Sequence, residues 1–388
     1  MKKKQRTLRR EDTTKKEVLH LAFELSQNKW KLGFSDGNRM RFKTIVARNL
    51  KQLQEEIEKA KEKFKLKADV RTMSCYEAGR DGFWLHRYLL SCGIDNVVVD
   101  SSSIEVDRRK RRAKTDRIDA RKLLGMLIRY HGGGERLLWR VVRVPSVAEE
   151  DGRQLHRELE VLKKERMMHR SRMKGLLIQQ GIAVKNPSSR KFLEELESLM
   201  TWDGNPLPLD FKARIVREYE RLKEVEAQIY TLRKERQSRL EKAECPSMRK
   251  VVQLMSLRGV VVQSSWKYVQ EFFGWRQFRN GKEVGSLAGL TPTPYDSGGS
   301  RREQGISKAG NKRIRTLSVE MSWVWLRFQP HSKLSQWYME RFAGRGKRMR
   351  RIGIVAMARK LLIDLWRYLE HGVIPEGAIL RSEIPSFY

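Results

Sequence analysis

The sequence predicts an α/β plus α protein, in which an N-terminal mixed-sheet domain precedes a long helical segment and a mostly helical C-terminal domain. Three observations support this prediction. Short β-rich runs alternate with helical periodicity over roughly the first hundred residues, heptad spacing occupies the middle of the chain, and helical patterns separated by glycine-rich turns follow. A chain of 388 residues is long enough for two or three domains.

The N-terminal part is predicted to hold strands followed by alternating helices and strands. Strands are expected over 18–24, 30–34, 40–47, 70–76 and 96–100, and helices over 50–64, 84–90 and 115–130. Asp36-Gly37 is typical of a tight hairpin turn between the second and third strands. The resulting order is that of the ribonuclease-H arrangement, a mixed sheet with helices on its faces.

Heptad spacing in the middle of the chain predicts two long helices with apolar seams. One seam runs over 155–176, and a second runs over 215–229 after a loop rich in Asn, Pro and Gly. Such seams form either an antiparallel hairpin within one chain or a coiled coil between chains. The predicted organisation is a basic arm over 1–16, the mixed-sheet domain over 17–145, a coiled-coil linker over 146–243 and a C-terminal domain over 244–388.

The charge balance predicts a polyanionic partner. Lys and Arg number 82 against 47 Asp and Glu, and the resulting net charge of +35 weakens the compact state unless a polyanion neutralises it. The basic residues are spread along the chain rather than gathered on one amphipathic helix, which favours nucleic acid over a membrane surface. No apolar stretch approaches the roughly 20 residues of a membrane span.

The remaining composition predicts a reduced, cytosolic protein. The three cysteines are far apart and form no CxxC motif, which excludes a disulfide framework and a zinc ribbon. The N-terminus is basic but lacks the apolar stretch of a secretory signal. Walker, GxGxxG and HExxH motifs are absent, so the sequence predicts neither nucleotide hydrolysis nor zinc proteolysis.

Carboxylates stand where a nuclease on a ribonuclease-H sheet needs them. Glu24 ends the first predicted strand, and Glu77 ends the fourth. Asp116 and Asp119 share one face of the last helix, at i and i+3. Such a set can hold two Mg²⁺ or Mn²⁺ ions about 4 Å apart. Singly, each acid also has a structural explanation, as a residue that favours a helix N-terminus or pairs with an arginine.

Basic residues surround these acids and recur later in the chain. Residues 108–122 hold nine basic residues, and Asp116 and Asp119 are the only acids among them. Further basic residues lie in a turn at 257–261 and in the glycine-rich stretch at 305–315. The predicted nucleic-acid contacts are Arg108, Arg109, Lys110, Arg111, Arg112, Lys114, Arg258, Lys308, Lys312, Arg313 and Arg315.

Ser297 stands between a proline-rich stretch and two glycines, in TPTPYDSGGS. This composition predicts an exposed loop, where the backbone can approach a phosphate closely. Lys308, Arg313 and Arg315 could hold the phosphate oxygens there. The simpler interpretation of these residues alone is a solvated basic turn.

Two motifs together resemble a known family. KTDRIDARKL at 114–123, with Glu77 in CYEAG, and the block LAGLTPTPYDSGGS followed by GISKAGNKRIR resemble the DEDD-type insertion-sequence transposases. These proteins have a RuvC-like domain and a C-terminal transposase domain, and a bridge RNA guides their recombination. The resemblance covers nearly the whole chain.

The resemblance implies a DNA recombinase with a covalent intermediate. Ser297 would be the nucleophile that forms a serine–DNA phosphodiester, and the four acids Glu24, Glu77, Asp116 and Asp119 would hold Mg²⁺ near the same phosphate. The implied partners are donor and target DNA, a guide RNA and further copies of the chain in a dimer or tetramer. The implied location is the prokaryotic cytoplasm, in association with the nucleoid.

Two positions depart from the family pattern. Glu24 stands where the family usually has Asp, so a carboxylate one methylene longer must reach the metal. The turn at 257–261 is LRGVV, whereas the family often has a Pro-Gly-Ile-Gly helix-hairpin-helix turn. With one glycine, this turn would offer a phosphate fewer close backbone amides, and Arg258 would supply charge instead.

Two rival functions remain open. A junction resolvase or nuclease would use the carboxylates to activate water and leave Ser297 idle. A binding protein without enzymatic activity would use the same acids only to balance its basic helix.

Overall fold

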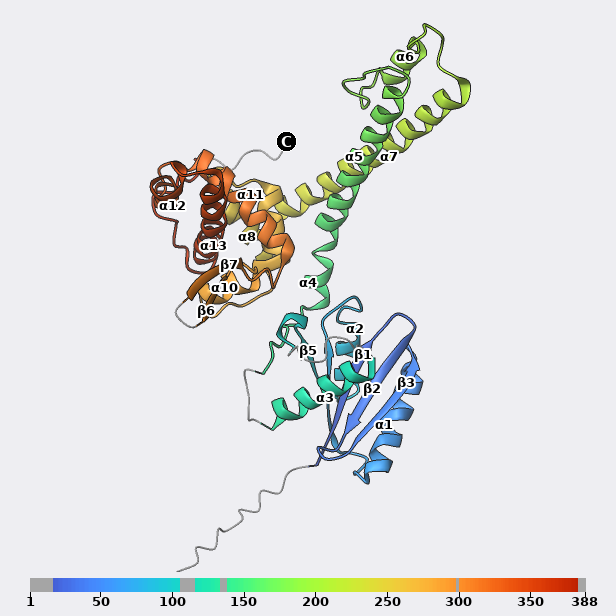
Figure 1. Ribbon diagram of the computed structural model, residues 1–388, viewed down its shortest axis with the longest axis vertical. Coiled ribbons are helices and arrows are strands. Elements are labelled where there is room, and N and C mark those ends of the chain that lie inside the picture. The colour runs from blue at the N-terminus through green and yellow to red at the C-terminus, as the bar shows by residue number, and fades with distance from the viewer. Residues whose placement is uncertain (1–16, 105–115, 133–137, 298–299, 383–388) are drawn as a thin grey trace, which may run out of the picture. The chain divides into compact units, whose positions relative to one another are not determined.

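The computed structural model describes residues 17–104, 116–132, 138–297 and 300–382. The chain divides into two compact units, Met1–Val144 and Pro145–Tyr388. Figure 1 shows the sheet of the first unit and the helices of the second. The predicted basic arm and the basic residues from Arg108 to Lys114 lie outside the described residues.

A mixed sheet in the order β3-β2-β1-β4-β5 forms the centre of the first unit. β1 pairs antiparallel with β2 and parallel with β4, and β4 pairs parallel with β5. The order of elements predicted from the sequence is confirmed, because two hairpin connections precede the two crossovers. The strands are β1 (Val18–Leu25), β2 (Lys29–Ser35), β3 (Met40–Val46), β4 (Arg71–Glu77) and β5 (Asp95–Val99).

Helices cover both faces of this sheet. On one face, α1 (Leu50–Phe64) and α2 (Trp84–Ser91) share a core with the strand residues Phe23 and Tyr76. On the other face, α3 (Asp116–His131) shares a core with Ala22 and Cys75, the strand residues next to Phe23 and Tyr76. Because successive strand residues point to opposite faces, the β-rich runs bury both of their sides.

The two predicted apolar seams meet inside the chain. α5 (Gln154–Ile178) packs along α7 (Leu209–Lys242), with α6 (Phe192–Glu197) in the connection between them. Leu159 and Leu162 share one core with Ile229. Of the two alternatives, the described structure therefore has the antiparallel hairpin (Figure 1). Side chains of this one chain pack in its seam.

The rest of the second unit is a helical body. α4 (Val147–Asp151) begins it, and Ser146 and Glu149 form a capping box at its start. Trp266, Phe272 and Trp325 are fully buried in its core. Its other helices are α8 (Pro246–Met255), α9 (Val262–Tyr268), the π-helical turn η3 (Val269–Phe273), α10 (Gly281–Leu287), α11 (Lys312–Phe328), α12 (Lys333–Tyr338), η4 (Met339–Ala343) and α13 (Lys347–His371).

The segment around Ser297 differs from the expected loop. β6 (Pro292–Ser297) and β7 (Ser300–Ile306) form a two-stranded antiparallel hairpin. The prolines in this stretch suggest a loop, but proline is tolerated in a strand whose outer edge has no partner. The prediction of a loop was wrong for the residues that flank the glycines, and Ser297 is the last residue of β6.

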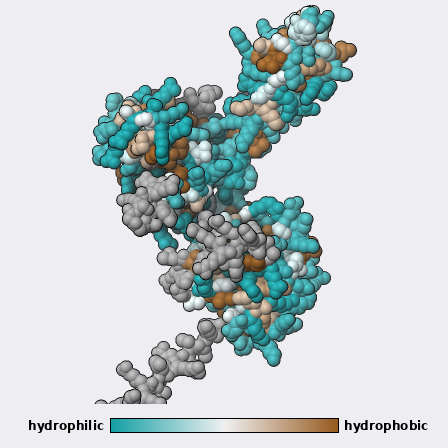
Figure 2. All heavy atoms as spheres, in the orientation of Figure 1, coloured by the Kyte–Doolittle hydropathy of each residue, from teal (hydrophilic) through white to brown (hydrophobic). Residues whose placement is uncertain are grey.

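None of the described helices combines the length and the apolar character that crossing a membrane requires. Figure 2 shows hydrophilic side chains over most of the visible face, with hydrophobic patches near the end of the α5–α7 hairpin, on the helical body and on the N-terminal unit. Trp202, in the connection before α7, and Leu209, its first residue, are strongly exposed.

Candidate functional site

Two of the predicted acids end adjacent parallel strands. Phe23 and Tyr76 are the last residues that pair β1 with β4, and Glu24 and Glu77 follow them directly. Glu24 is half-buried and Glu77 is exposed. Phe23 and Tyr76 face the core with α1 and α2, so the alternation of a strand turns Glu24 and Glu77 to the face that α3 covers.

Two contacts fix the direction of α3 across this face. The Cys75 Sγ atom lies 3.8 Å from the carbonyl oxygen of Leu123, and His20 Nε2 lies 3.2 Å from His131 Nδ1. Because His20 is near the start of β1 and His131 ends α3, the helix runs opposite to β1. Its first turn is therefore directed toward the carboxyl ends of β1 and β4.

The other two predicted acids occupy that first turn. Asp116 is exposed and Asp119 is half-buried. The first turn of α3, with Asp116 and Asp119, is thus directed toward the edge and face of the sheet that carry Glu24 and Glu77. Across the described ranges, however, no three His, Cys, Asp or Glu side chains lie close enough together to hold a metal ion.

The carboxylate groups at this edge of the sheet are ligands of the kind that a hard cation prefers. Mg²⁺ and Mn²⁺ prefer carboxylate oxygens, and Glu24, Glu77, Asp116 and Asp119 are all carboxylates. Two guanidinium groups of the same helix, those of Arg117 and Arg121, lie 5.6 and 5.8 Å from the ring centre of Phe42. The helix that carries Asp116 and Asp119 thus also carries two cations packed on Phe42.

Ser297 lies at the tip of the β6–β7 hairpin. Its backbone pairs with Ser300 at the end of both strands. The base of the hairpin is closed by Ser307, whose backbone N–H donates to the Thr291 carbonyl at 2.8 Å. The hairpin therefore places Ser297 at the end opposite its base.

Two predicted nucleic-acid residues make internal contacts instead of lying free. Arg315 donates through Nη1 to the carbonyl oxygens of Ala288 and Lys308, at 3.2 and 2.9 Å, and so ties the chain before the hairpin to the chain after it. Gly310 is required beside them, because its φ is +125° and a Cβ would collide with the Leu287 backbone. The role predicted for Arg315 in phosphate binding competes with this structural one.

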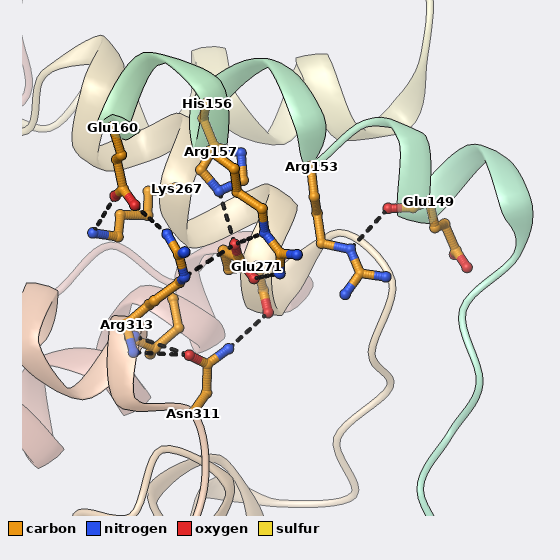
Figure 3. Close-up of polar contacts among 10 residues, drawn as sticks. Glu149, Arg153, His156, Arg157, Glu160, Lys267, Glu271, Asn311 and Arg313 are labelled. Atoms are coloured by element: carbon orange, nitrogen blue, oxygen red, sulfur yellow. Dashed lines mark hydrogen bonds and ion pairs between the residues drawn. The ribbon is translucent and has the colours of Figure 1, made fainter. Parts of the chain in front are cut away.

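Arg313 belongs to a buried polar network around Glu271. Figure 3 shows the Glu271 carboxylate between two residues of α5 and one of α11. Arg157 donates to both of its oxygens, at 2.7 and 2.9 Å, and His156 Nε2 lies 2.9 Å from Oε1. Arg313 pairs with Glu160, and its Nε lies 3.9 Å from Glu271.

The electrostatics of this network stabilise the ionised carboxylate. Burial alone would raise the pKa of Glu271, but the hydrogen bonds from His156 and Arg157 outweigh it and hold that pKa well below its usual range. The network joins α5, η3 and α11, so it fixes the helical hairpin to the helix that follows the serine hairpin.

The turn at 257–261 connects α8 to α9, as a helix-hairpin-helix turn would. Gly259 has φ +91° and lies against Phe328, so only glycine suits the position. Arg258 is exposed, and its backbone N–H donates to the Ile379 carbonyl at 3.1 Å. Lys308 and Lys312, the remaining described members of the predicted set, are exposed.

Sequence reasoning missed a second basic surface. Between η4 and the first turn of α13, exposed cations follow one another closely, and no described carboxylate forms an ion pair with them. The run GRGKRMRR at 344–351 was the available signal. Its members are Arg345, Lys347, Arg348, Arg350 and Arg351.

Comparison with known proteins shows similarity to transposases. Residues 234–336, which include the serine hairpin, match the model of the transposase IS116/IS110/IS902 family. The protein named "Putative transposase y4rJ" from Sinorhizobium fredii is 38% identical over 378 residues, covering 94% of this chain and 95% of that protein. The "Transposase for insertion sequence element IS1328" of Yersinia enterocolitica is 22% identical over 222 residues, 57% of this chain and 63% of that protein.

A match of this extent covers the carboxylate edge and the serine hairpin alike. The family explains the excess of positive charge, because a transposase acts on DNA. The chain belongs to the IS116/IS110/IS902 transposase family and is the DNA transposase of an insertion sequence.

Proposed function

We propose that this transposase cuts and rejoins DNA through a covalent bond between Ser297 and a DNA phosphate, with a guide RNA selecting the sites. The N-terminal unit is proposed to be a RuvC-like domain of the ribonuclease-H fold. The observation that carries the proposal is that the first turn of α3, with Asp116 and Asp119, is directed toward the edge and face of the sheet that carry Glu24 and Glu77.

The proposed step is a phosphoryl transfer. The Ser297 Oγ forms a bond to phosphorus, the bond from phosphorus to a deoxyribose oxygen breaks, and the serine proton ends on that leaving oxygen. The reverse attack by the hydroxyl of an incoming strand frees the serine and reseals the DNA. A serine hydroxyl is a weak nucleophile at neutral pH, so it must be activated.

The carboxylates are proposed to supply this activation indirectly. Glu24, Glu77, Asp116 and Asp119 would hold Mg²⁺ or Mn²⁺, which lowers the pKa of a bound hydroxyl and stabilises charge on the phosphate. The acids themselves provide negative charge and fixed positions. The neighbouring Arg117 and Arg121 orient the DNA backbone toward this edge.

The alternative, a resolvase that activates water, is not favoured by the transposase relatives. A suicide DNA substrate, incubated with the protein, Mg²⁺ and the guide RNA, separates the alternatives. A protein–DNA adduct that survives denaturation supports the serine route. Metal-dependent nicking without an adduct indicates the resolvase, and neither product indicates a binding protein.

A further inference from the structure

One cation of α5 contacts the start of α9, and three further cations of α5 and α7 act on it electrostatically. Lys163 and Arg166 come from α5, and Arg233 and Arg236 come from α7, which packs along it. Lys163 donates through Nζ to the Gln263 Oε1 atom, at 2.7 Å. Gln263 is the second residue of α9, so the cluster lies where three helices come together.

The cluster is electrostatically unfavourable in the free protein. Burial, and then the charges of Arg233 and Arg236, lower the pKa of Lys163 to about 8, and Arg166 acts in the same direction. Burial and the charge of Arg233 likewise lower the pKa of Arg236. Glu160 opposes this shift of the Lys163 pKa but does not cancel it.

No carboxylate neutralises the cluster. Among the residues that the structure describes, none of the four cations forms an ion pair, whereas other cations on the same helices do. Arg157 pairs with Glu271, and Arg239 pairs with Glu235. Glu160 is already engaged by Lys267 and by Arg313.

The cluster adjoins a turn in which three backbone donors are already occupied. In the turn at 257–261, the Arg258 N–H donates to Ile379, the Val260 N–H to Leu257, and the Val261 N–H to the Ser264 hydroxyl. These amides cannot serve a phosphate without breaking existing bonds. The cations of the cluster can bind a phosphate, because arginine forks suit phosphate oxygens and Arg233 is exposed.

We propose that Lys163, Arg233 and Arg236 bind a backbone phosphate of nucleic acid at the junction of α5, α7 and α9. The proposal rests on the function proposed above in one respect, that the phosphate belongs to a nucleic acid. A bound phosphate diester supplies the negative charge that this junction lacks. Both DNA and RNA carry that group, and the test separates them.

The test is a salt titration of binding, with a labelled DNA duplex and an RNA of the same sequence as probes. The double variant Arg233→Gln/Arg236→Gln should lower the slope of log affinity against log salt by about 1, the loss of one phosphate contact. The control is Arg239→Gln, which also removes charge from α7 but at an arginine that is already paired with Glu235. It should leave the slope unchanged.

Thermal unfolding of the free proteins excludes a structural role. Removing mutually repelling cations should leave the Tm of the double variant equal to or above that of the wild type. A slope unchanged on both probes, or a Tm lowered well below that of Arg239→Gln, would overturn the proposal. Loss of slope on one probe alone identifies whether DNA or RNA occupies the site. Repeating the titration in Ser297→Ala keeps the result independent of strand cleavage.

Discussion

Glu24 and Glu77 occupy equivalent positions at the ends of β1 and β4, each directly after the last residue that pairs these two strands with each other. Since the strands are parallel neighbours, the two carboxylates share one edge of the sheet and one face. α3 crosses that face with Asp116 and Asp119 in its first turn. This relationship is the basis for proposing these four acids as a ligand set.

Asp116→Asn should abolish strand cleavage while nucleic-acid binding persists or tightens. A lost carboxylate removes several kcal/mol of transition-state stabilisation from a two-metal site, whereas removing negative charge from a basic segment favours a polyanion. Cleavage in Mg²⁺ and binding by anisotropy measure the two effects. Asp95→Asn, at the start of β5, is the control and should cleave normally. Normal cleavage by Asp116→Asn would exclude Asp116 as a metal ligand.

The N-terminal unit was predictable from the sequence because its periodicities are strong. The DG turn and the β-rich run that ends at Glu24 correspond to the observed β2–β3 turn and to β1. The hairpin around Ser297 was not predictable, since its prolines and glycines suggest a loop. The cluster at Lys163 was also beyond sequence reasoning, because its members come together only when α5 and α7 pack.

Glu271→Gln should destabilise the second unit. Breaking a buried ion pair costs about 3–5 kcal/mol, and the lower end applies here because Arg157 is 38% exposed. The folded pKa of Glu271 lies below its unfolded value, so this stability is complete above about pH 4.3 and is lost as pH falls through the folded pKa. The difference in unfolding free energy from wild type should therefore shrink below pH 4.3. Glu235→Gln, in an exposed pair, should change stability little, and an equal loss there would refute the special role of Glu271.

Leu159→Lys should destabilise the chain rather than reduce its oligomeric mass. Leu159 is 2% exposed and faces the core shared with α7, so a charge there is buried without a partner. Light scattering and chemical denaturation check the two outcomes. Lys in place of the exposed Val161 is the control and should unfold like the wild type. If the Leu159→Lys variant has a lower mass and the stability of the wild type, the seam is an interface between chains.

Nucleic-acid binding should weaken steeply with salt. With roughly six to ten phosphates neutralised, affinity falls by about 10³–10⁵ between 50 and 200 mM salt. RNA should bind as well as DNA, because these contacts are to phosphates. Replacing Arg348 and Arg351 with Gln should make the slope shallower on both probes. A shallow slope for the wild type would mean that the excess charge of the chain is not used in binding.

Ser297→Ala gives the most direct test of the proposed chemistry. On a suicide substrate with guide RNA and Mg²⁺, this variant should bind DNA but form no adduct that survives denaturation, because the atom that bonds to phosphorus is gone. Ser300→Ala and Ser307→Ala, in the same hairpin region, should still form the adduct. An adduct that persists in Ser297→Ala and disappears in one of those variants, or recombination by Ser297→Ala itself, would contradict the account.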